Sequence, residues 1–309
     1  MVNRRSLFIA ALMVGLAPGA FAQTTTTPPK QDEGLQAAIR KSNAYIGLMN
    51  RTLRASQSWG RYTSWVNVRT GPTGRERYID YGLYSLYDVR SEIEKALAAT
   101  GEAPLVPALD ATMKRYVEAY QVLAPLITQA NGYYERKDYK ADNMAEGKAL
   151  HAKLLPAAEA FLRERATLDR EMRGFKRDIS TREIAAIEAA EGRKARWHVR
   201  NVMMHAEEII ELLPSNASPI VNMPAFDEVL ARYATAVREM DTYTQANPGQ
   251  VSGFESQPRS LLGKLRDFRD KLARAKGDAR RGAGQDMTWI VNEYNMMVTF
   301  SQNATRFVR

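Results

Sequence analysis

The chain has 309 residues, of which 44 are Lys or Arg and 35 are Asp or Glu, so its formal net charge is +9 at neutral pH. It contains no cysteine, which excludes disulfide bonds, thiolate metal ligands and a thiol nucleophile. A hydrophobic core must therefore stabilise the fold, and the chain is long enough to bury one.

The N-terminus has the layout of a secretory signal peptide over residues 1–22. Arg4 and Arg5 precede a short apolar run, and Ala20-Phe21-Ala22 forms a small-x-small cleavage site before Gln23. The run is too short to span a bilayer, and no cysteine follows to carry a lipid anchor. We therefore expect a soluble periplasmic protein with no transmembrane segment after cleavage. The arginine pair also fits a twin-arginine signal, although we favour the general Sec route.

Residues 23–33 contain the polar stretch TTTTPP and are predicted to form a disordered linker. From residue 34 to residue 309, apolar side chains recur every three or four positions, and no stretch alternates with period two. The clearest stripes are 109–134, 150–172, 226–240 and 261–275. The predicted fold class is all-α. We expect a single domain formed by an elongated bundle of about eight helices, several of them long and antiparallel, and a two-lobed domain is the alternative.

Several residues indicate where these helices begin. Ser180 to Glu183 and Ser252 to Glu255 both match a capping box. Pro224 and Pro258 fit the first turn of a helix, where proline is tolerated. Two further prolines, Pro125 and Pro156, fall inside apolar stripes, so these helices either kink there or are pairs of shorter helices.

Two internal segments carry a family resemblance. The stretch YYERKDYKADNMAEGKALH (133–151), together with GPTGRERYIDYGLYSLY (71–87), resembles the YiiG-like family of bacterial envelope proteins. The resemblance extends from about Asn43 to the C-terminus. It implies a helical, periplasm-facing protein, but it carries over no catalytic residue because none is known for the family. Some members look like lipoproteins, and this chain departs from them because it lacks the cysteine that would carry a lipid.

Tyrosines recur every three residues between positions 78 and 87. On an α-helix this spacing would wind the rings across half of the surface. Such a wall could stack on a sugar or an apolar ligand, because tyrosine offers a flat face and a hydroxyl group. The alternative is a packing face between helices. The candidate ligand-binding residues are Tyr78, Tyr81, Tyr84, Tyr87, Trp59 and Trp65.

Positive charge concentrates near the C-terminus. Between Arg259 and Arg281 there are nine Lys or Arg against three Asp. In an exported protein the partner of such a surface would be anionic lipid or lipopolysaccharide rather than nucleic acid. The alternative is a solvated helix face with intrahelical pairs, such as Asp267 with Lys271 and Asp270 with Arg274. The candidate anionic-surface residues are Lys264, Arg266, Arg269, Lys271, Arg274 and Lys276.

Two further groups have side chains that could bind a metal, although the spacing of the first, a row of carboxylates, matches no known ligand set. Asp138, Asp142 and Glu146 would line one face of a helix if that helix starts early. His198 and His205 share a helical face with Glu208 close by, which could form half of a zinc or haem site; the alternative is hydrogen-bonded core or rim residues. We predict no metal site and no cofactor. The motifs HExxH, GxSxG, the P-loop and the dinucleotide fingerprint are all absent.

The sequence therefore favours a periplasmic binding or interaction module of the cell envelope over an enzyme. The competing hypothesis is a cell-wall-directed hydrolase that uses paired carboxylates, since glycosidases need no short motif. A buried carboxyl group in a cleft beside the tyrosines would favour the hydrolase.

Overall fold

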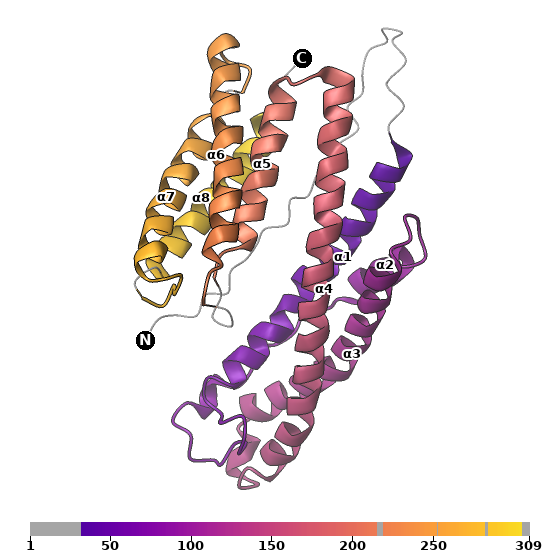
Figure 1. Cartoon of the computed structure of the whole chain (residues 1–309). Coiled ribbons are helices and arrows are strands. Elements are labelled where there is room, and N and C mark those ends of the chain that lie inside the picture. Colours follow the sequence, from indigo (N-terminus) through magenta and orange to yellow (C-terminus); the bar gives the residue numbers. More distant parts are fainter. Residues whose placement is uncertain (1–31, 215–218, 252, 282–283, 305–309) are drawn as a thin grey trace. The chain divides into compact units, whose positions relative to one another are not determined.

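The structure, a computed structural model, describes residues 32–214, 219–251, 253–281 and 284–304 (Figure 1). The predicted signal peptide and nearly all of the predicted linker lie outside these residues. The described residues form eight α-helices, two short 3-10 helices and one isolated bridge between Ile220 and Asp278, with no strand among them. The predicted all-α bundle is confirmed. None of the described helices is long and apolar enough to cross a membrane.

The chain divides into two compact units, and the first contains Lys30–Ile179 (the N-terminal unit). Its elements, in order, are α1 (Glu33–Tyr62), η1 (Ile79–Tyr81), α2 (Arg90–Ala99), α3 (Pro107–Glu135), η2 (Asp138–Lys140) and most of α4 (Ala145–Glu191). Asp32 accepts hydrogen bonds from the amides of Gly34 and Leu35 and so sets the start of α1.

The core of the N-terminal unit forms where α1, α3 and α4 lie side by side (Figure 1). The α3 stripe is buried as predicted, from Leu109 to Tyr134. Tyr116 on α3 stacks on Phe161 of α4, with ring centroids 5.2 Å apart. The periodicity of the apolar residues thus specifies which face of each helix is buried.

A buried ion pair lies in the same unit. Lys41 on α1 is only 1% exposed, and its Nζ lies 3.0 Å from Oδ1 of Asp110 on α3. The hydroxyl of Tyr45 donates to the same Oδ1 at 2.6 Å, and the amide of Val106 donates to Oδ2 at 2.9 Å. These bonds satisfy the carboxylate fully, which is what a buried charge requires.

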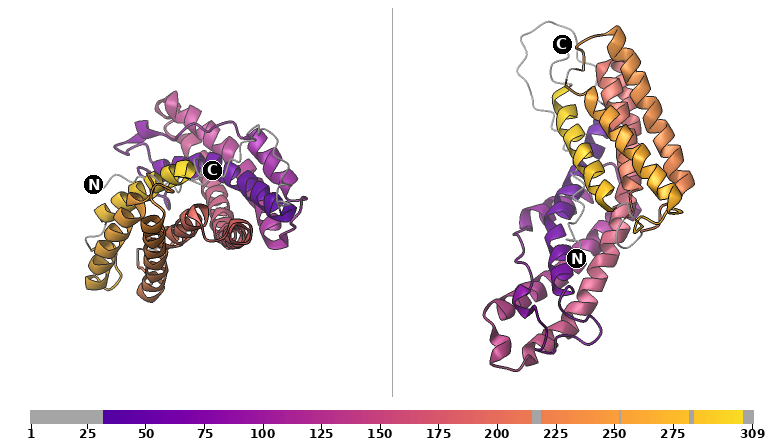
Figure 2. Two further views of the ribbon diagram at one scale, coloured as in Figure 1. Left: turned by 90° about the horizontal axis from the view of Figure 1, so that it is seen from above. Right: turned by 90° about the vertical axis from the view of Figure 1, so that its left-hand side faces the viewer.

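The second unit contains the residues from Ser180 onwards (the C-terminal unit). It comprises the end of α4 and the helices α5 (Ala195–Glu211), α6 (Met223–Ala246), α7 (Ser256–Arg274) and α8 (Gly284–Ala304). In chain order, α5 packs against α6, α6 against α7 and α7 against α8. Because α8 also packs against α5, the four helices close into a bundle (Figure 2). Phe226, Tyr233, Leu265, Phe268 and Ile290 are fully buried in its core.

Several predicted helix boundaries need correction. Both α3 and α4 run through their internal prolines, so Pro125 and Pro156 do not separate shorter helices. Ser180 is not a helix start but lies inside α4, because its hydroxyl and the carboxylate of Glu183 both bind the guanidinium of Arg200 on α5. These two side chains have tertiary partners, not backbone ones.

The other sites of helix initiation agree better with the sequence. Glu255 occupies the N-cap of α7, so this helix begins after the predicted capping box, whose Ser252 lies outside the described residues. Pro224 and Pro258 lie in the first turns of α6 and α7, as predicted.

Candidate functional site

The four regularly spaced tyrosines lie on a segment that is mostly non-helical. Only η1 is helical, and residues 82–89 lead from it to α2 without regular structure. The expectation that the rings wind around a helix is therefore wrong. Instead, apolar side chains between the tyrosines turn inward while the rings remain accessible. The buried residues are Ile79, Leu83 and Val89, and the exposed ones are Tyr78 (39%), Tyr81 (48%) and Tyr87 (51%).

One face of α1 holds the backbone of this segment. Arg54 Nε donates to the carbonyl of Ser85 at 3.2 Å. The hydroxyl of Ser58 accepts from the amide of Tyr84 at 3.0 Å and donates to its carbonyl at 3.1 Å. Arg61 Nε donates to the carbonyl of Tyr81. Residues 54, 58 and 61 are four and three positions apart, so they share a helix face and fix the segment along it.

The same arginines stack on the tyrosine rings. The Arg54 guanidinium carbon lies 3.9 Å from the ring centroid of Tyr84 and 5.7 Å from that of Tyr87. The Arg61 guanidinium lies 4.4 Å from Tyr84 and 5.7 Å from Tyr81. Each distance is within the range of a cation–π contact. Rings and guanidiniums therefore alternate along the segment.

Further contacts extend this row at both ends. Arg51 lies 5.2 Å from the ring centroid of Tyr87. At the other end, Tyr78 and Tyr81 stack with centroids 5.0 Å apart and an interplanar angle of 19°. We call the whole set the Tyr–Arg surface: Tyr78, Tyr81, Tyr84, Tyr87, Arg51, Arg54 and Arg61.

The two predicted tryptophans lie in the core and not on this surface. Trp59 and Trp65 are 9% and 8% exposed, so neither offers a ring face to a ligand. Trp65 Nε1 donates to the carbonyl of Gly82 at 3.0 Å, and its ring meets Tyr62 and Tyr134 edge-on. Trp65 thereby supports the segment that carries the tyrosines, whereas Trp59 packs against Tyr62 within the core.

The Tyr–Arg surface carries net positive charge. Arg51 pairs with Glu92 at 3.3 Å, whereas Arg54 and Arg61 form no ion pair within the described residues. The hydrogen bond from Arg90 lowers the pKa of Asp88 to about 2. Burial opposes ionisation of Glu76, but hydrogen bonds from Thr73 and Gly74 keep its pKa below the usual value. These two nearby carboxyl groups are therefore ionised at neutral pH and cannot act as proton donors.

The basic helix α7 is largely neutralised by its neighbours. Lys264 Nζ lies 3.8 Å from Oε2 of Glu293 on α8. Arg269 Nε lies 2.8 Å from Oδ1 of Asp227 on α6. Lys271 Nζ lies 2.7 Å from Oδ1 of Asp286 on α8. The predicted pairing of Lys271 with Asp267 is wrong, because Lys271 reaches across to α8. Within the described part of the chain, the α7-region cations that are exposed and form no ion pair are Arg266, Arg274 and Lys276.

The acidic row does not form one helical face. α4 begins only at Ala145, so the early helix start is wrong. Asp138 pairs with Arg136 at 2.7 Å. Asp142 accepts hydrogen bonds from the amides of Met144 and Glu146 at the start of α4, and the bond from Glu146 lowers its pKa. This carboxylate therefore stabilises a helix N-terminus.

The histidines are also separated. His205 Nδ1 bonds to Glu208 at 3.1 Å, whereas His198 is buried between the rings of Trp197 and Tyr243. His151 bonds to Tyr62 and to the carbonyl of Val68. No group of three or more metal-ligand side chains forms among the described residues.

Sequence reasoning identified the tyrosines but missed their arginine partners. Arg51, Arg54 and Arg61 are three and seven positions apart, which places them near one face of a helix. A spacing of three in the tyrosines also suits a 3-10 turn, where side chains three apart are eclipsed. Together, these two spacings could have suggested that the arginine face of the helix lies against the tyrosine segment.

Comparison with known proteins confirms the resemblance over most of the chain. The family model described as "Protein of unknown function (DUF3829)" matches residues 36–304. The uncharacterised protein YiiG of Escherichia coli (strain K12) is 26% identical over 305 residues, which covers 91% of this chain and 84% of that protein. No solved structure matches the chain.

Proposed function

Because the chain belongs to the DUF3829 family, whose function is unknown, we propose a function from its own residues. It is an exported, soluble helical-bundle protein that acts as a binding module in the periplasm, and its ligand-binding face is the Tyr–Arg surface. The export part of this proposal is supported by the layout of residues 1–22.

The ligand class follows from the side chains that are accessible. Tyr78, Tyr81 and Tyr87 are all more than one-third exposed and so can stack against the apolar face of a sugar ring. Arg54 and Arg61 supply planar cations that suit carboxylate or phosphate groups. The combination favours an anionic glycan, such as lipopolysaccharide or the glycan of the cell wall.

The observation that carries the proposal is the position of Arg54. Its guanidinium stacks on Tyr84 and its Nε is bonded to the Ser85 carbonyl, yet no acidic side chain among the described residues pairs with it. A cation held in one geometry beside exposed rings is organised before any ligand arrives. Such preorganisation reduces the entropic cost of binding.

Export is tested by fractionation of a cell that expresses the full chain. We expect the protein in the periplasmic extract, with an N-terminus at Gln23 and no acyl chain by mass spectrometry. Recovery only in a salt-resistant membrane pellet would contradict the export proposal. Replacement of both Arg4 and Arg5 by lysine should leave export intact if the Sec route is used.

The hydrolase alternative finds less support. Such an enzyme needs one carboxyl group that holds a proton at neutral pH. Among the described carboxyl groups with a resolved shift, only Asp169 on α4 has a raised pKa, and Glu76 and Asp88 near the tyrosines have lowered ones. Release of soluble fragments from purified peptidoglycan by the mature protein would nevertheless establish the enzyme and refute the binding module.

A further inference from the structure

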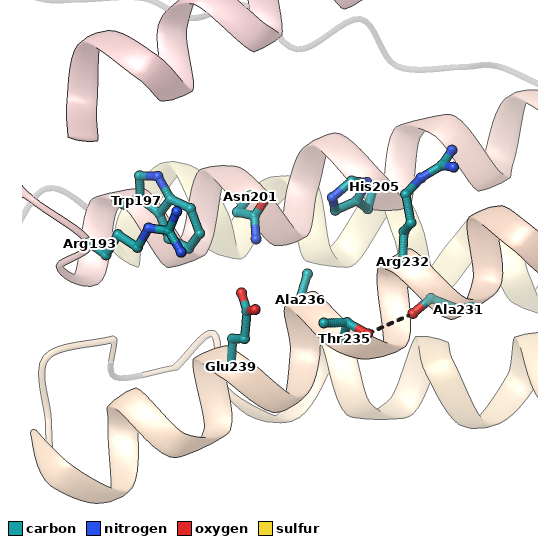
Figure 3. Close-up of a pocket in the computed structure, with 9 residues that line it drawn as sticks. All are labelled: Arg193, Trp197, Asn201, His205, Ala231, Arg232, Thr235, Ala236 and Glu239. Atoms are coloured by element: carbon teal, nitrogen blue, oxygen red, sulfur yellow. Dashed lines mark hydrogen bonds between the residues drawn. The ribbon is translucent and has the colours of Figure 1, made fainter. Parts of the chain in front are cut away.

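A hollow of about 390 Å³ opens between α5 and α6 in the C-terminal unit (Figure 3). On the α5 side it is lined by Trp197, Asn201 and His205, which are four residues apart and therefore share a face. On the α6 side the small residues Ala231, Thr235 and Ala236 leave room, and Glu239 reaches toward α5 (Figure 3). Arg193 and Arg232 lie at the two ends.

The amide of Asn201 points into this hollow without a partner. Asn201 is only 9% exposed, and its side chain forms no hydrogen bond within the described residues. The one hydrogen bond drawn between lining residues joins the Thr235 hydroxyl to the Ala231 carbonyl (Figure 3). Solvent reaches the amide from the hollow, because Asn201 is not among the side chains with a buried, unpartnered polar atom. A ligand in the hollow would therefore replace water on this amide.

The cations of the hollow are already neutralised. Arg193 pairs with Glu188 at 2.9 Å and lies over the Trp197 ring at 4.6 Å. Arg232 pairs with Glu228 at 2.5 Å and contacts Glu208 at 3.3 Å. Neither arginine is therefore available as the main binding group for an anion.

Glu239 differs because it is exposed at the edge of the hollow and no cation among the described residues pairs with it. His198 interacts electrostatically with Glu239. Burial lowers the pKa of His198, so the imidazole is neutral at physiological pH and leaves the carboxylate charge in place. The hollow thus combines an uncompensated carboxylate with an unpartnered amide.

We propose that the α5–α6 hollow binds a small molecule that carries an ammonium group. The ammonium pairs with the carboxylate of Glu239, and a second polar group of the ligand bonds to the Asn201 amide. A charge-assisted hydrogen bond to a carboxylate is stronger than a neutral one, so the ammonium provides most of the affinity. This site is independent of the Tyr–Arg surface, and neither proposal requires the other.

The test is calorimetric titration of the mature protein with 1,5-diaminopentane, and with 1,5-pentanediol as a probe of the same length without charge. We expect the diamine to bind and the diol to bind at least tenfold more weakly. Glu239→Gln should reduce diamine affinity by at least tenfold, because it removes the charge and keeps the shape. Glu102→Gln, the same change on an exposed residue of the N-terminal unit, should leave it unchanged.

A second variant separates binding from folding. Asn201→Leu removes the unpartnered amide and fills part of the hollow, so it should weaken diamine binding without lowering the melting temperature. The proposal is overturned if the diamine fails to bind the parent protein, if the diol binds equally well, or if Glu239→Gln binds the diamine as tightly as the parent.

Discussion

The guanidinium carbon of Arg54 lies 3.9 Å from the ring centroid of Tyr84, and the Nε of the same arginine donates to the carbonyl of Ser85. One side chain of α1 thus fixes both a ring and the adjacent backbone. Arg61 repeats this arrangement with Tyr84 and the carbonyl of Tyr81. The non-helical segment therefore presents its exposed tyrosines in a defined row.

Asp110 should be among the most sensitive positions of the N-terminal unit. Asp110→Ala leaves the ammonium of Lys41 buried without a partner and removes the acceptor of Tyr45. Breaking one side of a buried pair costs about 3–5 kcal/mol. Urea unfolding should show a corresponding decrease in the free energy of unfolding. Asp88→Ala, which breaks the exposed pair with Arg90, is the matched control and should change the midpoint little. Equal effects of the two variants would refute the role of the buried pair.

Asp169 should make stability depend on pH. Burial raises its pKa, although Arg165 and Arg173 partly oppose the shift. The folded pKa thus lies above the unfolded value of about 3.9. The folded state binds the proton more tightly, so the contribution of Asp169 to stability decreases as pH rises through the window between the two values.

Asp169→Asn keeps a neutral side chain at every pH. The variant should therefore melt at a higher temperature than the parent at neutral pH, and the difference should vanish below about pH 3.9, where aspartate is protonated in both states. Differential scanning calorimetry across this range measures the effect. A variant that melts lower than the parent at neutral pH would show that the ionised carboxylate is stabilised by its arginines.

Two glycines near α7 should respond in opposite directions to the same substitution. Gly277 has φ +83°, and a Cβ added there would lie 2.7 Å from the carbonyl oxygen of Val221. Gly277→Ala should therefore destabilise the protein by more than about 1 kcal/mol. Gly263 lies within α7, and beyond the nearby backbone of its own helix no atom lies within 4 Å of an added Cβ, so Gly263→Ala should stabilise the protein by about 0.5–1 kcal/mol. Guanidinium unfolding of both variants distinguishes these effects, and a loss of stability in both would contradict the structure at Gly263.

Apolar periodicity was the most reliable guide to this fold. The stripe that contains Tyr116 and the stripe that contains Phe268 are both buried as expected, because burial of one helix face leaves a direct record in the spacing of residues. Helix starts were less predictable. Ser180 and Glu183 have the spacing of a capping box, yet both bind Arg200 inside a continuous helix. That tertiary contact has no local signal in the sequence.

The candidate site was only partly predictable for the same reason. The tyrosine series is visible in the sequence, but its non-helical backbone is fixed by side chains of α1 that lie 20 to 26 residues earlier, such as Arg61 and Ser58. Likewise, the excess charge of α7 is evident in the sequence. Its neutralisation by Asp227 and Asp286 depends on which helices pack against α7.

The most direct test of the central claim is binding of the mature protein to anionic glycans at low salt. Lipopolysaccharide and purified peptidoglycan sacculi form separate arms, so that the source of the glycan is also identified. The variant is Tyr81→Leu combined with Tyr87→Leu, which removes two exposed rings but keeps the bonds from Arg54 and Arg61 to the backbone. The control is Arg266→Gln combined with Arg274→Gln on α7.

We predict that the parent and the α7 control bind one of the two glycans. The tyrosine variant should bind that glycan at least tenfold more weakly, with an unchanged melting temperature. Binding should also weaken as salt increases, because exposed charges are screened beyond about 8 Å at physiological ionic strength. Retention of the tyrosine variant equal to that of the parent, or loss of binding in the α7 control alone, would contradict the claim that the Tyr–Arg surface is the binding face.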